Sequence, residues 1–166
     1  MRKGKKSLGE THPEVARQWH PTKNGDLTPN DFTKGSKSRV WWKCDKGDDH
    51  EWETTIGNRT SGSNCPICRG LKVVLSNCFA TKKPLISKQW HPTKNGNLTP
   101  YDFTTGSRKK AWWKCPEEED HEWETAIVNR TIGSNCPYCS GNKVSMSNCF
   151  ATKKPLISKQ WHPTKN

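Results

Sequence analysis

Polar and apolar residues alternate in two short neighbouring stretches of the chain. In the first, KSRVWWK at residues 37–43, Val40 and Trp42 fall on one face of an extended strand. In the second, EWETTI at residues 51–56, Trp52 takes the equivalent place. We expect the two stretches to pair as an antiparallel hairpin with these apolar side chains on its core face.

Three further segments carry helix signals. KPLISKQW, residues 83–90, has a proline near its start and apolar residues at helical spacing, which predicts a short helix. LTPNDF and LTPYDF each place a proline at the first position of a one-turn helix, behind the caps Thr28 and Thr99. NRTSGSN, residues 58–64, predicts a loop. We expect the helical segment and the WHP turn after it to cover the following hairpin.

The whole pattern returns after 71 residues, with no insertion or deletion. The motif WHPTKN begins at Trp19, Trp90 and Trp161, and residues 76–95 are identical to residues 147–166. This ending favours a piece of a longer array over a segment that caps the second repeat. The predicted parts are a basic N-terminal tail (1–7), a first repeat (8–75), a second repeat (76–146) and the truncated start of a third (147–166).

Composition argues against one large apolar core. Only 30% of the residues are hydrophobic and the mean hydropathy is −1.04, yet nine Trp and eight Cys argue against disorder. Small domains of this kind usually need disulfides or a metal. No apolar run is long enough for a membrane helix, and the N-terminus lacks the apolar region of a signal peptide. We therefore expect an intracellular location, cytoplasmic or nuclear, where cysteines stay reduced.

The formal net charge of +12 is typical of proteins that bind nucleic acid, but its distribution weakens that inference. Residues 1–7 and 147–166 each carry +4. The first repeat carries only +1 and the second +3. Most of the positive charge therefore lies outside the two complete repeats.

Each repeat contains Cys-x5-His, then fourteen residues, then Cys-Pro-x-Cys. Two close pairs of nitrogen and sulfur ligands suit tetrahedral Zn²⁺, and four protein ligands leave no open position for a substrate. The pattern therefore predicts two structural zinc ions per chain and no enzyme activity. The predicted ligands are Cys44, His50, Cys65 and Cys68 in the first repeat, and Cys115, His121, Cys136 and Cys139 in the second.

Other interpretations of these residues compete with zinc. A reducing compartment and the leftover Cys78 and Cys149 argue against disulfides, and iron suits a histidine with a single Cys-x2-Cys less well. His50 and His121 could be surface residues, but both recur inside an otherwise altered connection. Cys78 and Cys149 are expected to be buried apolar residues. Packing or turn roles are expected for His20, His91 and His162.

The combination W-W-x-C…H-x-W…N-R-x-x-G-S-x-C-P-x-C-x-G resembles the tandem repeats of probable zinc-ribbon or treble-clef zinc fingers. The resemblance covers nearly the whole chain from about residue 10. It implies a small, zinc-stabilised α+β fold in which each repeat is a β-hairpin with a knuckle and short helices, and it implies the same ligand sets. Some relatives are joined to restriction-endonuclease-like domains, which implies a nucleic-acid setting, although these 166 residues contain no nuclease domain. The acidic connections 45–49 and 117–120 depart from the family's usual short Gly-His connection, which weakens a phosphate-binding role for the tip.

The outer face of the predicted hairpin carries basic residues around a tryptophan, a combination that suits phosphate contact and base stacking. Glu51 and Glu53 should lie opposite and neutralise part of this charge. The leading hypothesis is a non-catalytic zinc module that binds DNA or RNA. The alternative is a structural or protein–protein interaction scaffold, and neither a membrane nor a small-molecule substrate is expected. The predicted nucleic-acid contacts are Lys37, Arg39, Trp41, Lys43 and Arg59 in the first repeat, and Arg108, Lys110, Trp112, Lys114 and Arg130 in the second.

Overall fold

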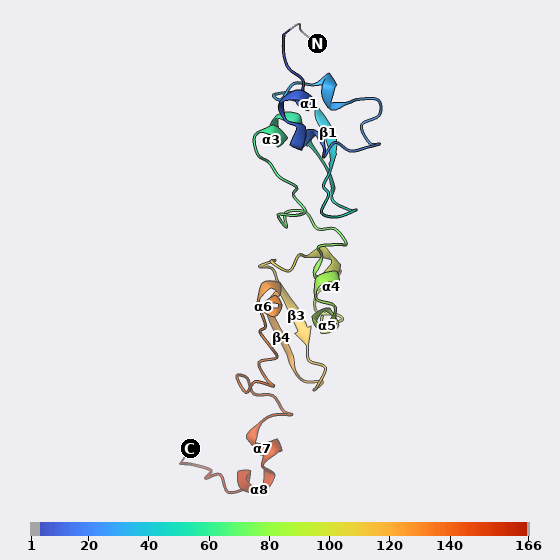
Figure 1. Cartoon of the computed structure of the whole chain (residues 1–166). Coiled ribbons are helices and arrows are strands. Elements are labelled where there is room, and N and C mark those ends of the chain that lie inside the picture. Colours follow the sequence, from blue (N-terminus) through green and yellow to red (C-terminus); the bar gives the residue numbers. More distant parts are fainter. Residues whose placement is uncertain (1–3, 166) are drawn as a thin grey trace. The chain divides into compact units, whose positions relative to one another are not determined.

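A computed structural model describes residues 4–165 of the chain. They divide into two compact units whose boundary lies between Asn77 and Cys78. Each unit is built around its own two-stranded antiparallel sheet (Figure 1). No helix among the described residues is long and apolar enough to cross a membrane.

The second unit repeats the order of elements of the first and adds two short helices at its end. In the first they are α1 (Leu8–Thr11), α2 (Pro13–Ala16), the 3-10 helix η1 (Pro29–Asp31), β1 (Arg39–Lys43), β2 (Glu51–Thr55) and α3 (Ile56–Thr60). In the second they are α4 (Phe79–Lys82), α5 (Pro84–Ser87), η2 (Pro100–Asp102), β3 (Lys110–Lys114), β4 (Glu122–Ala126), α6 (Ile127–Thr131), α7 (Phe150–Lys153) and α8 (Pro155–Ser158). This is the small α+β fold that the sequence predicts.

The predicted hairpins are confirmed, with their predicted faces. β1 pairs with β2 so that Trp42 lies opposite Trp52, and both side chains are buried with Val40. β3 and β4 have the same register, with Trp113 opposite Trp123. Each hairpin therefore buries one face and leaves the other polar, as its alternating sequence requires.

A pair of one-turn helices and the WHP turn cover the core face of each hairpin, as expected. The rings of Trp19 and Trp42 meet edge to face at 5.5 Å between centroids, and those of Trp90 and Trp113 at 5.3 Å. The cover also joins the sheet edge, because the His91 N–H donates to the Trp112 carbonyl at 3.0 Å. This segment therefore closes the small core and extends the sheet.

The helices of the cover are shorter than the sequence suggests. The helix predicted at 83–90 spans only Pro84–Ser87, because the chain beyond it turns to bond with β3. Leu85 is 75% exposed, whereas Ile86 packs against the core. The one-turn helices η1 and η2 are confirmed, with Thr28 and Thr99 each capping the helix start.

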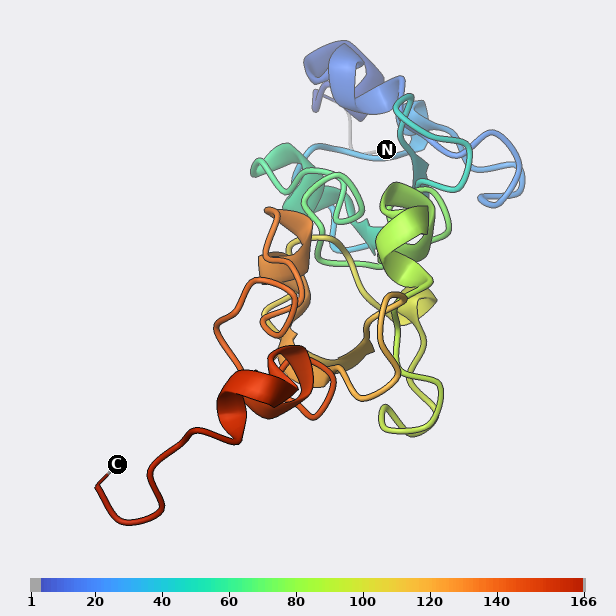
Figure 2. The ribbon, with the colours of Figure 1, turned by 90° about the horizontal axis from the view of Figure 1, so that it is seen from below.

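The loop predicted at 58–64 begins instead as helix. α3 starts at the buried Ile56, and the Thr55 hydroxyl accepts the Asn58 N–H at 3.2 Å, which caps the helix start. The repeated cysteine outside the ligand sets also differs between its two copies. Cys78 is fully buried, as expected, but Cys149 is partly exposed beside α7, red in Figure 2.

Candidate metal centre

The tip of each hairpin and the turn that follows α3 or α6 bring the predicted ligands together. After β1, the Cys44 N–H donates to the His50 carbonyl at 3.0 Å, and the His50 N–H donates to Gly47 at 3.1 Å, so the connection folds back on itself. The Arg69 N–H donates to the Cys65 carbonyl at 3.2 Å, which closes the Cys-Pro-x-Cys turn. The backbone thus points both ligand pairs at one place.

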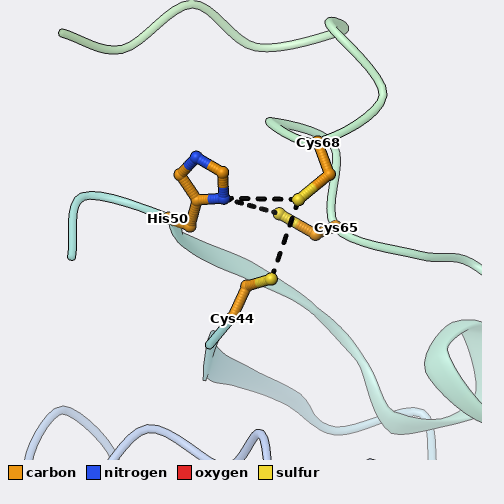
Figure 3. Close-up of side chains that lie close together, drawn as sticks. All are labelled: Cys44, His50, Cys65 and Cys68. Carbon is orange, nitrogen blue, oxygen red and sulfur yellow. Dashed lines mark hydrogen bonds between the residues drawn. The ribbon is translucent and has the colours of Figure 1, made fainter. Parts of the chain in front are cut away.

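In the first unit the four ligand atoms lie within 4.8 Å of one another (Figure 3). The Sγ atoms of Cys44 and Cys68 are 3.7 Å apart, and His50 Nδ1 lies 3.9 Å from Cys65 Sγ and 3.3 Å from Cys68 Sγ. Tetrahedral zinc with Zn–S bonds of about 2.3 Å separates two sulfurs by about 3.8 Å. The spacing of these donors therefore fits one zinc ion.

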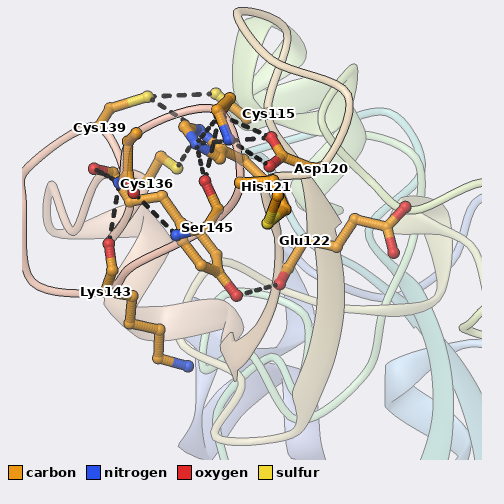
Figure 4. A network of polar contacts seen from close by, with 12 residues as sticks. Cys115, Asp120, His121, Glu122, Cys136, Cys139, Lys143 and Ser145 are labelled. Carbon is orange, nitrogen blue, oxygen red and sulfur yellow. Dashed lines mark hydrogen bonds and ion pairs between the residues drawn. The ribbon is translucent and has the colours of Figure 1, made fainter. Parts of the chain in front are cut away.

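The second unit repeats this geometry (Figure 4). The Sγ atoms of Cys115 and Cys139 are 3.6 Å apart. His121 Nδ1 lies 3.7 Å from Cys136 Sγ and 3.5 Å from Cys139 Sγ. The two Cys3His sets, one per repeat, thus fit two structural zinc ions.

The chemistry of the thiols also favours a cation at each site. Desolvation, followed by the neighbouring Cys44 and Cys65 thiols, raises the pKa of Cys68 to about 12. The same causes raise the pKa of Cys139 to about 12. Thiolates this close repel one another unless a positive charge lies between them. A zinc ion supplies that charge and holds the hairpin tip to the Cys-Pro-x-Cys turn.

In the first unit, one serine orients the histidine ligand. Ser76 Oγ lies 3.2 Å from His50 Nε2, the ring nitrogen that faces away from the thiols. The Ser76 N–H donates to Asp49 Oδ2 at 2.8 Å, and its hydrogen bonds lower the pKa of Asp49. An Nε2–H held in this way leaves Nδ1 free to bind the metal.

In the second unit, more side chains contact the histidine ligand. Ser145 Oγ and Ser147 Oγ each lie 2.9 Å from His121 Nε2, and Ser147 also donates to Asp120 Oδ1 at 2.7 Å. The ring of Tyr138 stacks on His121 at 4.9 Å between centroids. The ligand spacing gives no sign of the two serines, since they lie 24 and 26 residues beyond His121.

Arg59 and Arg130 do not have the accessible position that a phosphate contact requires. They are 5% and 4% exposed. The Arg59 guanidinium donates to the Ser63 carbonyl and, at 2.7 Å, to Gln18 Oε1, and it lies within 5.5 Å of the ring centroids of two core tryptophans. Burial in the core thus replaces the surface role that we predicted for both arginines.

Each buried arginine has an electrostatic partner in the metal centre. Burial lowers the pKa of Arg59, whereas the charges of Cys65 and Cys44 raise it. Arg130 is affected in the same way by burial and by the matching cysteines. Three thiolates and a neutral imidazole leave a zinc site with one negative charge, which the buried guanidinium balances. We therefore assign these arginines to the support of the metal centre.

The outer face of the first hairpin is organised around Glu51. His20 Nε2 lies 3.0 Å from Glu51 Oε1, Lys43 Nζ lies 3.7 Å from the same atom, and Lys23 pairs with Oε2. Hydrogen bonds from Lys23 and then His20 lower the pKa of Glu51 to about 2. Lys23 Nζ also sits 4.6 Å from the ring centroid of Trp41. Of the residues predicted for nucleic-acid contact, Lys43 is thus already paired here.

The second hairpin has the same arrangement around Glu122. His91 Nε2 lies 2.9 Å from Glu122 Oε1, and Lys94 Nζ lies 4.6 Å from the ring centroid of Trp112. His20 and His91 are buried and accept backbone N–H groups of the following turn on Nδ1, which confirms their packing and turn roles. His162 is exposed and accepts the Thr164 N–H at 3.2 Å.

The remaining predicted contacts lie where each first strand begins. Arg39 pairs with Glu53 at 3.3 Å and Lys110 with Glu124 at 3.7 Å. Just before each strand, Lys37 and Arg108 are exposed, and neither has an ion-pair partner among the described residues.

Comparison with known families agrees with this geometry. The model of the probable treble clef zinc finger domain matches residues 15–71 and again residues 86–142. Each matched span contains one complete Cys3His set. No curated protein is similar enough to the chain to count as a match.

Proposed function

Because the chain belongs to the probable treble clef zinc finger family, which it matches twice, we propose that it is a non-catalytic tandem zinc module that binds nucleic acid. The zinc sites build the two folds, and the contacts come from basic side chains at the start of each hairpin. The observation that carries the proposal is the pair of exposed cations Lys37 and Arg108, which occupy equivalent positions without carboxylate partners among the described residues.

The exposed residues at the two ends of each hairpin differ in charge, although the exposed Lys46 and Arg69 also lie at the zinc end of the first unit. Exposed acidic residues lie in the connection at the zinc end, including Asp45 and Asp48 in the first unit. Exposed basic residues lie at the opposite end, where the first strand begins. They are Lys34, Lys37 and Arg39 in the first unit, and Arg108, Lys109 and Lys110 in the second. A polyanion is attracted to this basic end.

A cavity beside this basic end supports an anion-binding role in the first unit. Its volume is about 480 Å³, and its lining includes hydroxyl groups as well as ammonium groups. The lining residues are Lys5, Lys6, Thr11, Thr33, Lys34 and Gly35. Ammonium and hydroxyl groups are the donors that commonly contact the phosphates of nucleic acids.

Trp41 and Trp112 add a surface for bases. Each is half-buried on the outer hairpin face, with a lysine ammonium over its ring. Stacking of unpaired bases on such rings favours a single-stranded ligand over a duplex. The proposed ligand is therefore single-stranded DNA or RNA, held by phosphate contacts at the basic end.

The test is binding of labelled single-stranded and duplex oligonucleotides, measured by fluorescence anisotropy from about 50 mM salt upward. The double variant Lys37→Glu/Arg108→Glu should weaken binding at least tenfold and reduce the dependence of log affinity on log salt by about two. Arg39 and Lys110 are left intact, because reversing them would place like charges beside their ion-pair partners Glu53 and Glu124. Zinc content should stay at two ions per chain.

The matched control reverses two exposed lysines, one in each copy of the repeated segment 76–95 and 147–166. Lys88→Glu/Lys159→Glu changes the net charge by the same amount and lies at equivalent positions of the repeat. It should weaken binding much less than the test pair. Equal losses of affinity in the test and control variants would show that overall charge alone accounts for binding, which would contradict a specific contact at Lys37 and Arg108. If the unchanged protein does not bind at low salt, the proposal is rejected in favour of a scaffold.

A further inference from the structure

Another cavity lies in the second unit, between β4 and the turn that carries Cys136 and Cys139. Its volume is about 480 Å³, which is within the range of about 300–1,000 Å³ that is usual for small-molecule sites. The cavity is separate from the metal centre, since none of its lining residues is a zinc ligand. The lining residues are Trp123, Glu124, Thr125, Ser134, Asn135, Pro137, Ser140, Asn142 and Lys143.

Hydrogen bonds hold the walls of this cavity in place. The Tyr138 hydroxyl donates to the Glu122 carbonyl at 3.1 Å, which joins the turn to β4. The Asn142 N–H donates to the Pro137 carbonyl at 2.8 Å, which closes the turn. A cavity held in this way is formed before a ligand binds, so binding requires little further ordering of the chain.

Several polar groups of the lining are available to a ligand. Within the part of the chain that the structure describes, the Asn135 carboxamide and the Ser134 hydroxyl form no hydrogen bond. Asn142 Nδ2 donates to Ser140 Oγ at 3.1 Å, which leaves Asn142 Oδ1 as an acceptor. Glu124 makes its ion pair through Oε2 at 3.7 Å. Amide donors together with amide and carboxylate acceptors are the groups that read the edges of nucleobases.

The cavity adjoins the tryptophan that we propose to stack on bases. Glu124 lies directly opposite Trp112 in the β3–β4 register, so the two side chains share the outer face of the hairpin. Trp123 and Pro137 add apolar surface to the cavity. A strand with one base stacked on Trp112 can therefore place a neighbouring base in the cavity.

The first unit has a different lining at two positions. Seven of the nine lining residues have an identical counterpart 71 residues earlier in the chain. The two exceptions are Arg69 and Leu71, which stand where the second unit has Ser140 and Asn142. The first unit therefore lacks the neutral hydrogen-bonding groups that the second unit has at these places.

The conserved lysine of this lining also has a different contact in each unit. Lys72 Nζ donates to the Glu51 carbonyl at 3.1 Å in the first unit. In the second unit the Tyr138 hydroxyl makes the matching bond. Lys143 Nζ lies 5.9 Å from the centroid of the Tyr138 ring and has no ion-pair partner among residues 4–165. Its ammonium group is thus available to a phosphate beside the cavity.

From these contacts we infer that the cavity binds one unpaired base of a single strand, so that the second unit reads bases and the first does not. The inference rests on the proposed nucleic-acid function. Glu124 and the Asn142 carbonyl accept hydrogen bonds, so they favour a base with an exocyclic amino group. Adenine and cytosine carry such a group, whereas thymine and uracil carry none.

The test compares the homopolymers dA, dC and dT, each of about ten nucleotides, by fluorescence anisotropy at low salt. Wild type should bind dA or dC at least about threefold more tightly than dT. Asn135→Ala should bring this ratio close to one, and so should the graft Ser140→Arg/Asn142→Leu, which copies the first unit. The ratio is the readout, because the added arginine charge strengthens binding of every homopolymer alike.

The matched control is Asn64→Ala, the equivalent change in the first unit, which should leave the ratio unchanged. All three variants should retain two zinc ions. Equal binding of the homopolymers by wild type, or a preference for dT, would overturn the base-reading site and leave the proposed function standing. A ratio unchanged in both Asn135→Ala and the graft, or lowered as much by Asn64→Ala, would also overturn it. If no homopolymer binds, the proposed function fails and this inference fails with it.

Discussion

The two histidine ligands differ in how many hydroxyl groups orient them. Ser76 is the one serine whose hydroxyl contacts His50 among the described residues, because Val74 stands where the second unit has Ser145. His121 is contacted by both Ser145 and Ser147. The same substitution should therefore have different effects in the two units.

We predict that Ser76→Ala weakens zinc binding at the first site by about tenfold, since loss of a group that orients a metal-bound histidine has effects of this size. Ser147→Ala should weaken the second site by less than about threefold, because Ser145 still holds the ring. Competition with a chromophoric chelator measures both affinities. Equal losses at the two sites would contradict the orienting role.

The buried arginines allow a second prediction for single residues. Arg59→Leu keeps an apolar stem against the tryptophans but removes the charge that balances the zinc site. We expect it to lower the free energy of unfolding of the first unit by about 3 kcal/mol, as when one partner of a buried ion pair is removed. Chemical denaturation measures the change. Arg69→Leu, an exposed position next to Cys68, is the control and should have little effect.

Among the elements, the hairpin offers adjacent tryptophans on opposite faces of one strand. Trp42 is completely buried, whereas Trp41 is half-buried under Lys23. We predict that Trp42→Ala lowers the free energy of unfolding by about 3–5 kcal/mol through the cavity it leaves. Trp41→Ala should lower it by about 1 kcal/mol, the size of a cation–π contact. Thermal and chemical unfolding of both variants test this. Equal losses in the free energy of unfolding would mean that both faces of the hairpin belong to the hydrophobic core.

Elements defined by local pattern could be predicted from the sequence, and those defined by distant partners could not. The strands follow from alternation, and η1 and η2 follow from Thr-Pro caps, since both signals lie within a few residues. Arg59 looks like a surface cation in its Gly/Ser-rich setting. Its burial depends on Gln18, which is 41 residues away in sequence. The zinc ligands were predictable because metal coordination restricts both residue type and spacing.

At the scale of the whole molecule, each unit has its own core and its own metal site. We predict that Cys65→Ser and Cys136→Ser each reduce the zinc content from two ions per chain to one. Only the unit that carries the substitution should unfold, because the fold of so small a unit depends on its metal. Metal analysis with limited proteolysis identifies the unfolded half. Loss of both ions from either variant would show that the units fold together.

Zinc loading should also make the whole chain sensitive to pH. The pKa of Cys68 and that of Cys139 are raised to about 12, so both thiols are protonated at pH 7 and must release a proton when zinc binds. Protons therefore compete with the metal, and the affinity of each site should fall at least about tenfold for each unit of decreasing pH. Calorimetric titration with zinc, in buffers of different ionisation enthalpy, counts the protons released, and at least one per ion is expected. Affinities that stay constant between about pH 6 and pH 8 would contradict thiolate coordination at these positions.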